Sequence, residues 1–303
     1  MRETLVAREE ASVSRLGPVD VEFRRATEDD LRAEYEVFLA AQGELLARHG
    51  FGAPQTSPES FAKTHGHLLT HDGERSFVAE AKGRIIAFCA AFVRDDTWFL
   101  SAMFVLPEIQ GRGVGKRLLD LSWSEGDRRR LTITESIQPL SNGLYARRGL
   151  VPLTPILALA GEARADDPRE LEAGIPDRAV LAVIDRDAYG FERRVDHDFW
   201  ASEAECTLWY RDGAPVAYSY VSAAGGIGPL ASRDQKGAAS ALRAELARLS
   251  GAEAAVTVPG SARELVEVAL AAGLRFESRP GLLLVSSAVQ APTSLAISSY
   301  WLL

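Results

Sequence analysis

The order of apolar and polar residues in the first hundred positions predicts strands and one long helix. Residues 21–26 (VEFRRA) alternate as a half-buried strand does. Thr27 and the acidic residues that follow it are typical of a helix start, and the helix is expected to run to about Leu46. Residues 76–93 predict two strands joined by a turn at Lys82-Gly83, which is a β-hairpin.

The next stretch continues this alternation of strands and helices. Residues 97–106 form an apolar, aromatic-rich strand, and a helix with an apolar face follows from about Val114. Residues 130–136 predict a further strand, and residues 139–153 predict a short helix that Gly149 ends before another strand. The fold class predicted from these elements is α/β, as an α+β mixed sheet.

The second half of the chain partly repeats the first. Two pairs of segments align: 81–88 with 211–218, and 144–150 with 268–274. The aligned glycines lie 66 residues apart in the first half and 60 in the second, so the same elements recur in one order at nearly one spacing. This recurrence indicates a duplicated domain.

A polar segment rich in Pro, Gly and Ala separates the two copies, and we place the connection between domains there. The predicted organisation is an N-terminal extension at 1–20, a first domain at 21–160, a linker at 161–179 and a second domain at 180–303.

The most glycine-punctuated stretch, EIQGRGVGKRLLDLS at 108–122, lies between the predicted strand and helix of the first domain. A Walker A loop would need Gly at position 110 and a hydroxyl at 117, where the chain has Gln and Arg. A dinucleotide fingerprint starting at Gly111 would need a third Gly at 116, where the chain has Lys. The pattern that fits is Q-x-x-G-x-G, formed by Gln110, Gly113 and Gly115.

With this loop, the sequence resembles the GNAT superfamily of N-acetyltransferases, whose acetyl-CoA site is a strand, a glycine loop and a helix. The later segment SNGLYARRGLVPL resembles the family's Asn and Tyr motif and supplies Asn142 and Tyr145. The physical reason for the glycines is close approach, because backbone N–H groups surround a pyrophosphate only where side chains leave room. The helix N-terminus favours the same anion.

The resemblance implies two GNAT-like domains in tandem, each a twisted, mostly antiparallel sheet flanked by helices. It also implies acetyl-CoA as cosubstrate, Tyr145 as the acid that protonates the departing thiolate, and backbone N–H groups near Val105 that point at the thioester. The implied cofactor-binding residues are Met103, Phe104, Val105, Gln110, Gly111, Arg112, Gly113, Val114, Gly115, Lys116 and Asn142. A general base stays unassigned, with Glu135 and Glu44 as candidates and ordered water as an alternative.

Composition and charge limit the classes of partner that we expect for this protein. The formal net charge is −8 and basic residues form one short run at 128–130, so we expect no nucleic acid. Two cysteines far apart in apolar surroundings give no disulfide framework, and the longest apolar run is too short to span a bilayer. We therefore expect a cytoplasmic monomer or homodimer without membrane contact, acting on a small-molecule or peptide amine.

Two histidine-containing segments raise the question of a metal site. His65, His67 and His71 lie in one segment, but no carboxylate or cysteine pattern completes a ligand set. Asp196, His197 and Asp198 are consecutive, so they point in different directions on any regular element. We expect no metal, and we expect the second segment to pack or to line a substrate groove.

The second domain lacks the motif chemistry of the first. In the repeat alignment Tyr145 corresponds to Ala269 and Asn142 to Val266, and the junction at 226–242 has no Q-x-x-G-x-G. We predict an acetyl-CoA-dependent N-acetyltransferase with an active first domain and a degenerate second one, which either completes the acceptor site or covers a sheet edge. The alternative is a non-catalytic acyl-CoA-binding sensor, which would not need Tyr145.

Overall fold

The computed structural model describes residues 20–123, 126, 129–166, 169–277, 279–286 and 289–303. Apart from Asp20, the predicted N-terminal extension lies outside the described residues, and so does Arg128 of the basic run. None of the helices in the described part of the chain is both long and apolar enough to cross a membrane.

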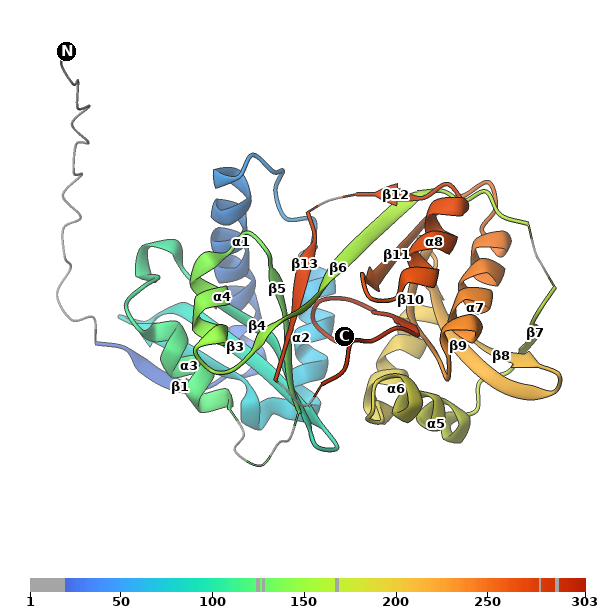
Figure 1. Cartoon of the computed structure of the whole chain (residues 1–303). Helices are drawn as coiled ribbons and strands as arrows, with labels where there is room; N and C mark the ends of the chain where they lie inside the picture. The colour runs from blue at the N-terminus through green and yellow to red at the C-terminus, as the bar shows by residue number, and fades with distance from the viewer. Residues whose placement is uncertain (1–19, 124–125, 127–128, 167–168, 278, 287–288) are drawn as a thin grey trace, which may run out of the picture.

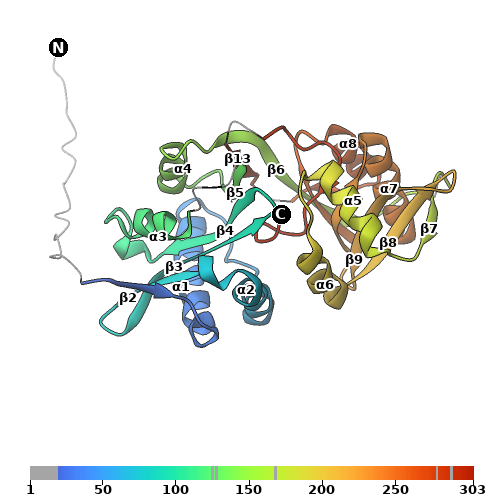
Figure 2. The same ribbon diagram turned by 90° about the horizontal axis from the view of Figure 1, so that it is seen from below.

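The first half alternates strands and helices as its residue pattern predicts (Figure 1). It contains β1 (Glu22–Arg25), α1 (Leu31–Arg48), α2 (Pro58–Asp72), β2 (Phe77–Ala81), β3 (Arg84–Arg94), β4 (Thr97–Val105), α3 (Val114–Ser122), β5 (Arg129–Glu135), α4 (Pro139–Ala146) and β6 (Val151–Glu162), with 3-10 helices η1 (Glu28–Asp30), η2 (Gly73–Arg75) and η3 (Pro107–Ile109). Helices α1 and α2 pack on one face of this part of the sheet and α3 on the other (Figure 2).

The second half repeats the order of the first. It contains β7 (Glu172–Gly174), α5 (Arg178–Ala188), α6 (Arg194–Glu203), β8 (Ala204–Arg211), β9 (Ala214–Ser222), β10 (Gly226–Ser232), α7 (Gln235–Arg248), β11 (Glu253–Pro259), α8 (Arg263–Ala271), β12 (Arg275–Phe276), β13 (Gly281–Val285) and β14 (Leu295–Ala296). The predicted recurrence is confirmed in detail at the two hairpin turns. Both central residues have positive φ in each of them, 53° and 73° at Lys82-Gly83 and 52° and 75° at Asp212-Gly213.

The residue pattern did not predict three of the helices in the described part of the chain, namely α2, α5 and α6. The start of α2 carries a readable signal, because Ser57 accepts a hydrogen bond from the Ser60 amide and Pro58 occupies the first helical position. Asp177 caps α5 in the same way. In α2 and α6, buried polar residues such as His65 and Asp196 interrupt the apolar stripe, which makes these two helices hard to recognise from the residue pattern.

The described strands form one mixed sheet in the order β1-β2-β3-β4-β5-β13-β6-β11-β10-β9-β8-β7, with β12 pairing to β6 and β14 to β10. The paired strands are antiparallel except β4 with β5 and β10 with β11, which are parallel. The predicted mixed, mostly antiparallel sheet flanked by helices is therefore confirmed.

The two halves exchange strands across their boundary. Strand β13, from near the end of the chain, lies between β5 and the start of β6 in the first half. The far end of β6 lies between β11 and β12 in the second half. Figure 1 shows β6 running from one half into the other beside β13. The predicted linker at 161–179 thus begins within a shared strand, so each half depends on the other to complete its sheet.

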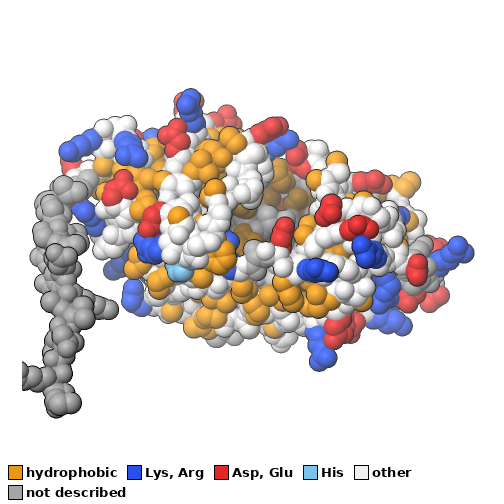
Figure 3. All heavy atoms as spheres, turned by 90° about the horizontal axis from the view of Figure 1, so that it is seen from above, with side chains coloured by type: hydrophobic (Ala, Val, Ile, Leu, Met, Phe, Trp, Pro, Cys, Tyr) orange, Lys and Arg blue, Asp and Glu red, His pale blue; other side chains and the backbone are white. Residues whose placement is uncertain are grey.

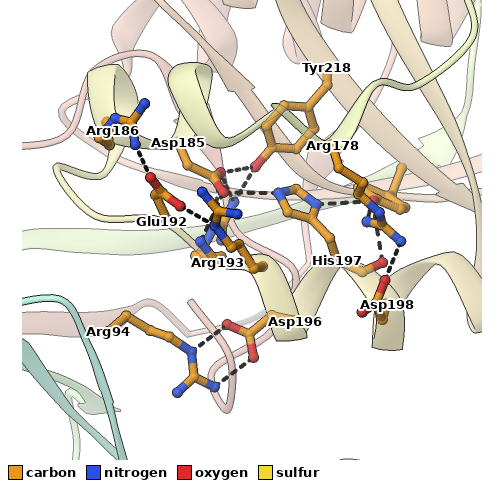
Figure 4. Close-up of polar contacts among 12 residues, drawn as sticks. Arg94, Arg178, Asp185, Arg186, Glu192, Arg193, Asp196, His197, Asp198 and Tyr218 are labelled. Carbon is orange, nitrogen blue, oxygen red and sulfur yellow. Dashed lines mark hydrogen bonds and ion pairs between the residues drawn. The ribbon is translucent and has the colours of Figure 1, made fainter. Parts of the chain in front are cut away.

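A buried polar network joins the halves. Arg94 on β3 donates to both carboxylate oxygens of Asp196 on α6, at 2.8 and 3.0 Å (Figure 4). It also donates to Asp72 on α2 at 2.9 Å. His67 contacts Asp196 at 2.8 Å. Because all four groups are buried or nearly so, each charge needs its partner, and the network fixes how α6 sits against the first half.

Candidate active site

The glycine loop leads directly into α3, and its backbone explains its composition. Gly111 and Gly113 have φ of 78° and 87°, a region that L-residues with side chains rarely adopt. A Cβ added at either position would meet no atom within 4 Å, so the glycines are required by the backbone and leave open space beside it. At Gly115 a Cβ would lie 3.4 Å from Val105, which brings α3 close to β4.

The N-terminus of α3 has no side-chain cap. Gly113 is the N-cap residue, and within the described part of the chain no side chain caps the first turn. The first amides of a helix have no partner within the helix, and they carry its partial positive charge. The loop therefore presents backbone donors that suit an anion.

Strand β4 parts from β5 beside this loop. The two strands pair only from Thr97 to Leu100, and the pairing of β4 with β3 shifts register at Ser101, which is a β-bulge. Beyond it, Met103–Val105 run without β5 as a neighbour, so one edge of β4 faces a gap in the sheet.

A cavity of about 1080 Å³ occupies this gap and extends along α1 and the loop before α2. Nine of the predicted site residues line it: Met103, Phe104, Val105, Gln110, Gly111, Gly113, Gly115, Lys116 and Tyr145. The tertiary structure thus gathers the glycine loop, β4 and α4 around one space, which is large enough for a drug-sized ligand.

Three predicted cofactor-binding residues lie outside the lining. Arg112 is exposed and Val114 is buried in the core, so only their backbone belongs to the loop. The Asn142 amide donates to the backbone carbonyls of Glu135 and Ser136, at 3.3 and 3.4 Å, and ties α4 to the end of β5. Their contact with a cofactor remains a prediction. Among the lining residues, Gln110 turns its side-chain amide back to the Val105 carbonyl at 3.0 Å, which holds the loop on β4.

Tyr145 lies on α4 with its ring buried against the cavity. Burial, and to a smaller extent the nearby Cys89, raises the pKa of the Tyr145 hydroxyl above its usual range. The phenol therefore keeps its proton at neutral pH, which is the state that a proton donor needs.

The two candidate bases differ in position. Glu135, at the end of β5, lines the cavity and accepts hydrogen bonds from Gln42 at 2.6 Å and from Arg279 at 2.8 Å. Glu44 pairs with Arg48 on the exposed side of α1 and does not line the cavity. Of the two, only Glu135 is in reach of a group bound there.

Residues from the second half complete the lining, and sequence reasoning missed them. They are Phe276, Glu277, Arg279, Tyr300 and Trp301. The backbone carbonyl of Trp301 accepts a hydrogen bond from Ser101 at the bulge, and the Tyr300 hydroxyl accepts one from the Gly281 amide at 3.1 Å. Because these residues follow Gly273, more than 130 positions after the bulge, no local signal in the sequence places them here.

The histidine segments have structural partners. His65 is buried and stacks on Phe61 with centroids 3.9 Å apart, and burial lowers its pKa to about 3. His197 contacts Asp185 at 2.9 Å, while Asp196 faces Arg94 and Asp198 pairs with Arg178 (Figure 4). The three consecutive side chains point in different directions as predicted, and their segment packs the interface rather than lining the cavity. Within the described residues no cluster of three or more potential ligands suits a metal ion.

Comparisons with known proteins agree with this architecture. Residues 72–151 match the family model of the acetyltransferase (GNAT) domain. The chain is similar to a putative acetyltransferase from Pyrococcus horikoshii, with a TM-score of 0.73 and 16% identity over 100% of this chain and 99% of that one. It is also similar to a GCN5-related N-acetyltransferase from Sphaerobacter thermophilus, with a TM-score of 0.61 and 16% identity over 90% and 98% of the two chains.

A third similar structure is a tandem GNAT protein from the clavulanic acid biosynthesis pathway, with a TM-score of 0.57 and 16% identity over 88% of this chain and 98% of that one. Among curated proteins no match was found. Residues 72–151 are therefore similar to a GNAT acetyltransferase domain, and the chain shares its overall fold with GNAT proteins, tandem ones among them.

Proposed function

We propose that the protein is an acetyl-CoA-dependent N-acetyltransferase whose active site is the cavity of the first half. The observation that carries this proposal is the uncapped N-terminus of α3, which opens on a cavity of about 1080 Å³ that Tyr145 also lines. A helix end with free amides, a gap between β4 and β5 and a protonated phenol are what thioester chemistry needs in one place.

The glycine loop suits a pyrophosphate. Backbone amides from Gly111 to Lys116 are the proposed donors, and the open space beside Gly111 and Gly113 lets an anion approach them closely. Lys116 lines the cavity and would add a positive charge. Met103–Val105, on the free edge of β4, would hold the pantetheine arm through their backbone.

Acetyl-CoA would supply the thioester as acetyl donor. The amine nitrogen forms the new bond to the carbonyl carbon, and the bond from that carbon to sulfur breaks. Backbone amides of β4 near Val105 would stabilise the oxyanion at the tetrahedral stage. Tyr145 would donate its proton to the departing thiolate, and Glu135 would take a proton from the amine, directly or through water.

The decisive experiment is a titration with acetyl-CoA followed by an amine-library screen that measures CoA release. Wild-type protein should bind acetyl-CoA and release CoA with a competent amine. Acetyl-CoA binding without turnover on any amine would favour the sensor, and absence of binding would overturn the site itself.

A further inference from the structure

Exposed apolar side chains are concentrated at the mouth of the cavity. Seven large apolar side chains are exposed among the described residues, and three of them line this one cavity: Phe51 (40% exposed), Leu140 (54%) and Phe276 (54%). They come from the loop before α2, from α4 and from β12, so three distant segments bring them together. Figure 3 shows apolar side chains gathered on this upper face of the first half. Such clustering marks a binding surface rather than scattered surface exposure.

Helix α1 turns an apolar stripe toward the same space. The side chains that it contributes to the cavity are spaced as one helical face: Phe38, Ala41, Gln42, Leu45 and Leu46. Four of these five are apolar. A surface helix normally buries such a stripe in protein, and here part of it faces a cavity.

An aromatic wall faces α1 from the C-terminal segment. The Trp301 ring lies 5.4 Å from that of Phe38 and 6.0 Å from that of Phe104, and all three line the cavity. Tyr300 lines it beside them. The second half of the chain thus supplies part of the apolar lining.

Charge on this side of the cavity is localised. Among the described residues, five charged side chains line the cavity: Lys116 and Arg147 belong to α3 and the end of α4, and Glu277 is exposed beside Phe276. Of the others, Glu135 and Arg279 form an ion pair, with 14% and 18% of their side chains exposed. Gln42 holds the same carboxylate at 2.6 Å. Of the two carboxylates in this lining, Glu135 is held inside the cavity and Glu277 is exposed, so an amine bound inside the cavity would have its nitrogen near Glu135 and its body against the apolar walls.

From this arrangement we infer that the acceptor is a primary amine with an apolar body, aromatic or branched aliphatic, and with a single positive charge. The inference rests on the proposed function and names its substrate class. The amine nitrogen lies at Glu135, and the body packs between α1, the rim residues Phe51 and Phe276, and Trp301. Polyamines, aminoglycosides and lysine side chains should be poorer acceptors, because a distal polar group would lose water against the apolar walls and could pair with a carboxylate only at the exposed Glu277.

The test uses two amines of the same length. Hexylamine and 1,5-diaminopentane have the same number of heavy atoms and differ only in a methyl group against an ammonium at the far end. We expect kcat/KM for hexylamine to exceed that for the diamine by about 10-fold or more, the size expected for placing a charge where a methyl packs. 2-Phenylethylamine should be acetylated at least as well as hexylamine.

Variants at the rim locate the effect in the cavity. Phe276→Ser and Phe51→Ser change exposed side chains, so both proteins should fold. We expect each to raise KM for hexylamine about 5-fold, from lost apolar contact, and to raise the KM for the diamine less, because the far end of the diamine gains little from apolar contact. The matched control is Ile175→Ser, an exposed apolar residue (87%) outside the cavity lining, which should change none of these constants.

The outcomes separate this inference from the proposed function. If acetyl-CoA does not bind, the proposed function is wrong. If acetyl-CoA binds but the diamine is the better acceptor, if no apolar amine is acetylated, or if Phe276→Ser behaves like Ile175→Ser, then the substrate class is wrong while the acetyl-CoA site stands.

Discussion

The helices that follow the central strands of the two halves begin in opposite ways. In the first half, α3 starts at Gly113 without a side-chain cap. In the second half, the Asp234 carboxylate caps α7 and accepts a hydrogen bond from the Gly237 amide at 2.6 Å. A carboxylate already satisfies the donors that a phosphate would use and repels a second anion. One copy of the repeat therefore leaves open the helix end that we propose as the anion site, and in the other copy a side chain of the protein occupies the corresponding position.

The two halves also differ in the gap between the parallel strands beside these helices, which is open in the first half and filled in the second. In the first half the space between β4 and β5 opens into the cavity. In the second half β14 pairs with β10, and Ile297 bridges to Thr257 of β11, so the chain fills the corresponding gap. The segment then continues to Tyr300 and Trp301 in the cavity of the first half. The second copy thus has no such gap of its own, and its C-terminal segment completes the cavity of the first copy.

The largest effect expected from this difference is on acetyl-CoA binding. Gly113→Glu should weaken it by about 1000-fold or more, because a carboxylate at the mouth of α3 repels a pyrophosphate and φ at this position disfavours a side chain. Isothermal titration measures the affinity. Gly251→Glu is the control, since Gly251 has φ of 84° and equally open surroundings but lies outside the cavity lining. Equal affinities of the two variants would contradict the site.

The stability of the contact between the two halves should depend on Asp196. Burial opposes its ionisation, but the hydrogen bonds from His67 and Arg94 outweigh burial and lower the pKa of Asp196 to about 2. Asp196→Ala leaves Arg94 with one carboxylate fewer and should lower the free energy of unfolding by about 3–5 kcal/mol. Asp198→Ala, whose side chain is exposed in its pair with Arg178, should change it by less than about 1 kcal/mol.

The same pair of variants predicts a pH dependence. A carboxyl whose pKa is lower in the folded state stabilises the fold above its unfolded pKa of about 3.9, and this contribution disappears as the pH falls through the folded value. Wild-type protein should therefore lose the contribution of Asp196 between about pH 4 and pH 2. Denaturant titrations at several pH values in this range measure the free energy of unfolding. This free energy should change less with pH in Asp196→Ala than in Asp198→Ala.

Substitution of Tyr145 tests whether the first half catalyses acetyl transfer as well as binding acetyl-CoA. Tyr145→Phe should keep the affinity for acetyl-CoA and lower kcat about 100-fold, the effect typical of removing a general acid. Because burial raises the pKa of this phenol, wild-type activity should not fall at alkaline pH through its ionisation below about pH 10. A wild-type rate in the variant would show that another group protonates the thiolate.

The smallest effect is expected in the second half of the chain, where Asp234 caps α7. Asp234→Ala should destabilise the protein by about 1 kcal/mol, the usual value of a helix cap. Titration should still find one acetyl-CoA per chain, because β14 continues to occupy the gap between β10 and β11. A second binding event in this variant would show that the cap alone closes the site.

Local physical chemistry makes part of the site readable from the sequence. Gly111 and Gly113 adopt a backbone that few other residues tolerate, so the loop can be recognised by spacing alone. The hairpin turns are readable for the same reason, since Lys82-Gly83 and Asp212-Gly213 both need positive φ. These signals predicted the mixed sheet, the duplication and the strand, loop and helix around the proposed pyrophosphate site.

The rest of the fold and of the candidate site depends on contacts between residues that are far apart in the chain. No local pattern indicates that β13 inserts beside β5, that Arg279 meets Glu135, or that Trp301 closes a cavity formed by the first half. The pairing of two strands depends on which edges meet after folding, and side-chain types in one segment do not record this. The repeated fold and the glycine loop can be recognised in the sequence, because both depend on neighbouring residues and on backbone conformation. Which half keeps an open cavity, and which distant residues line it, depends on contacts that form only when the chain folds.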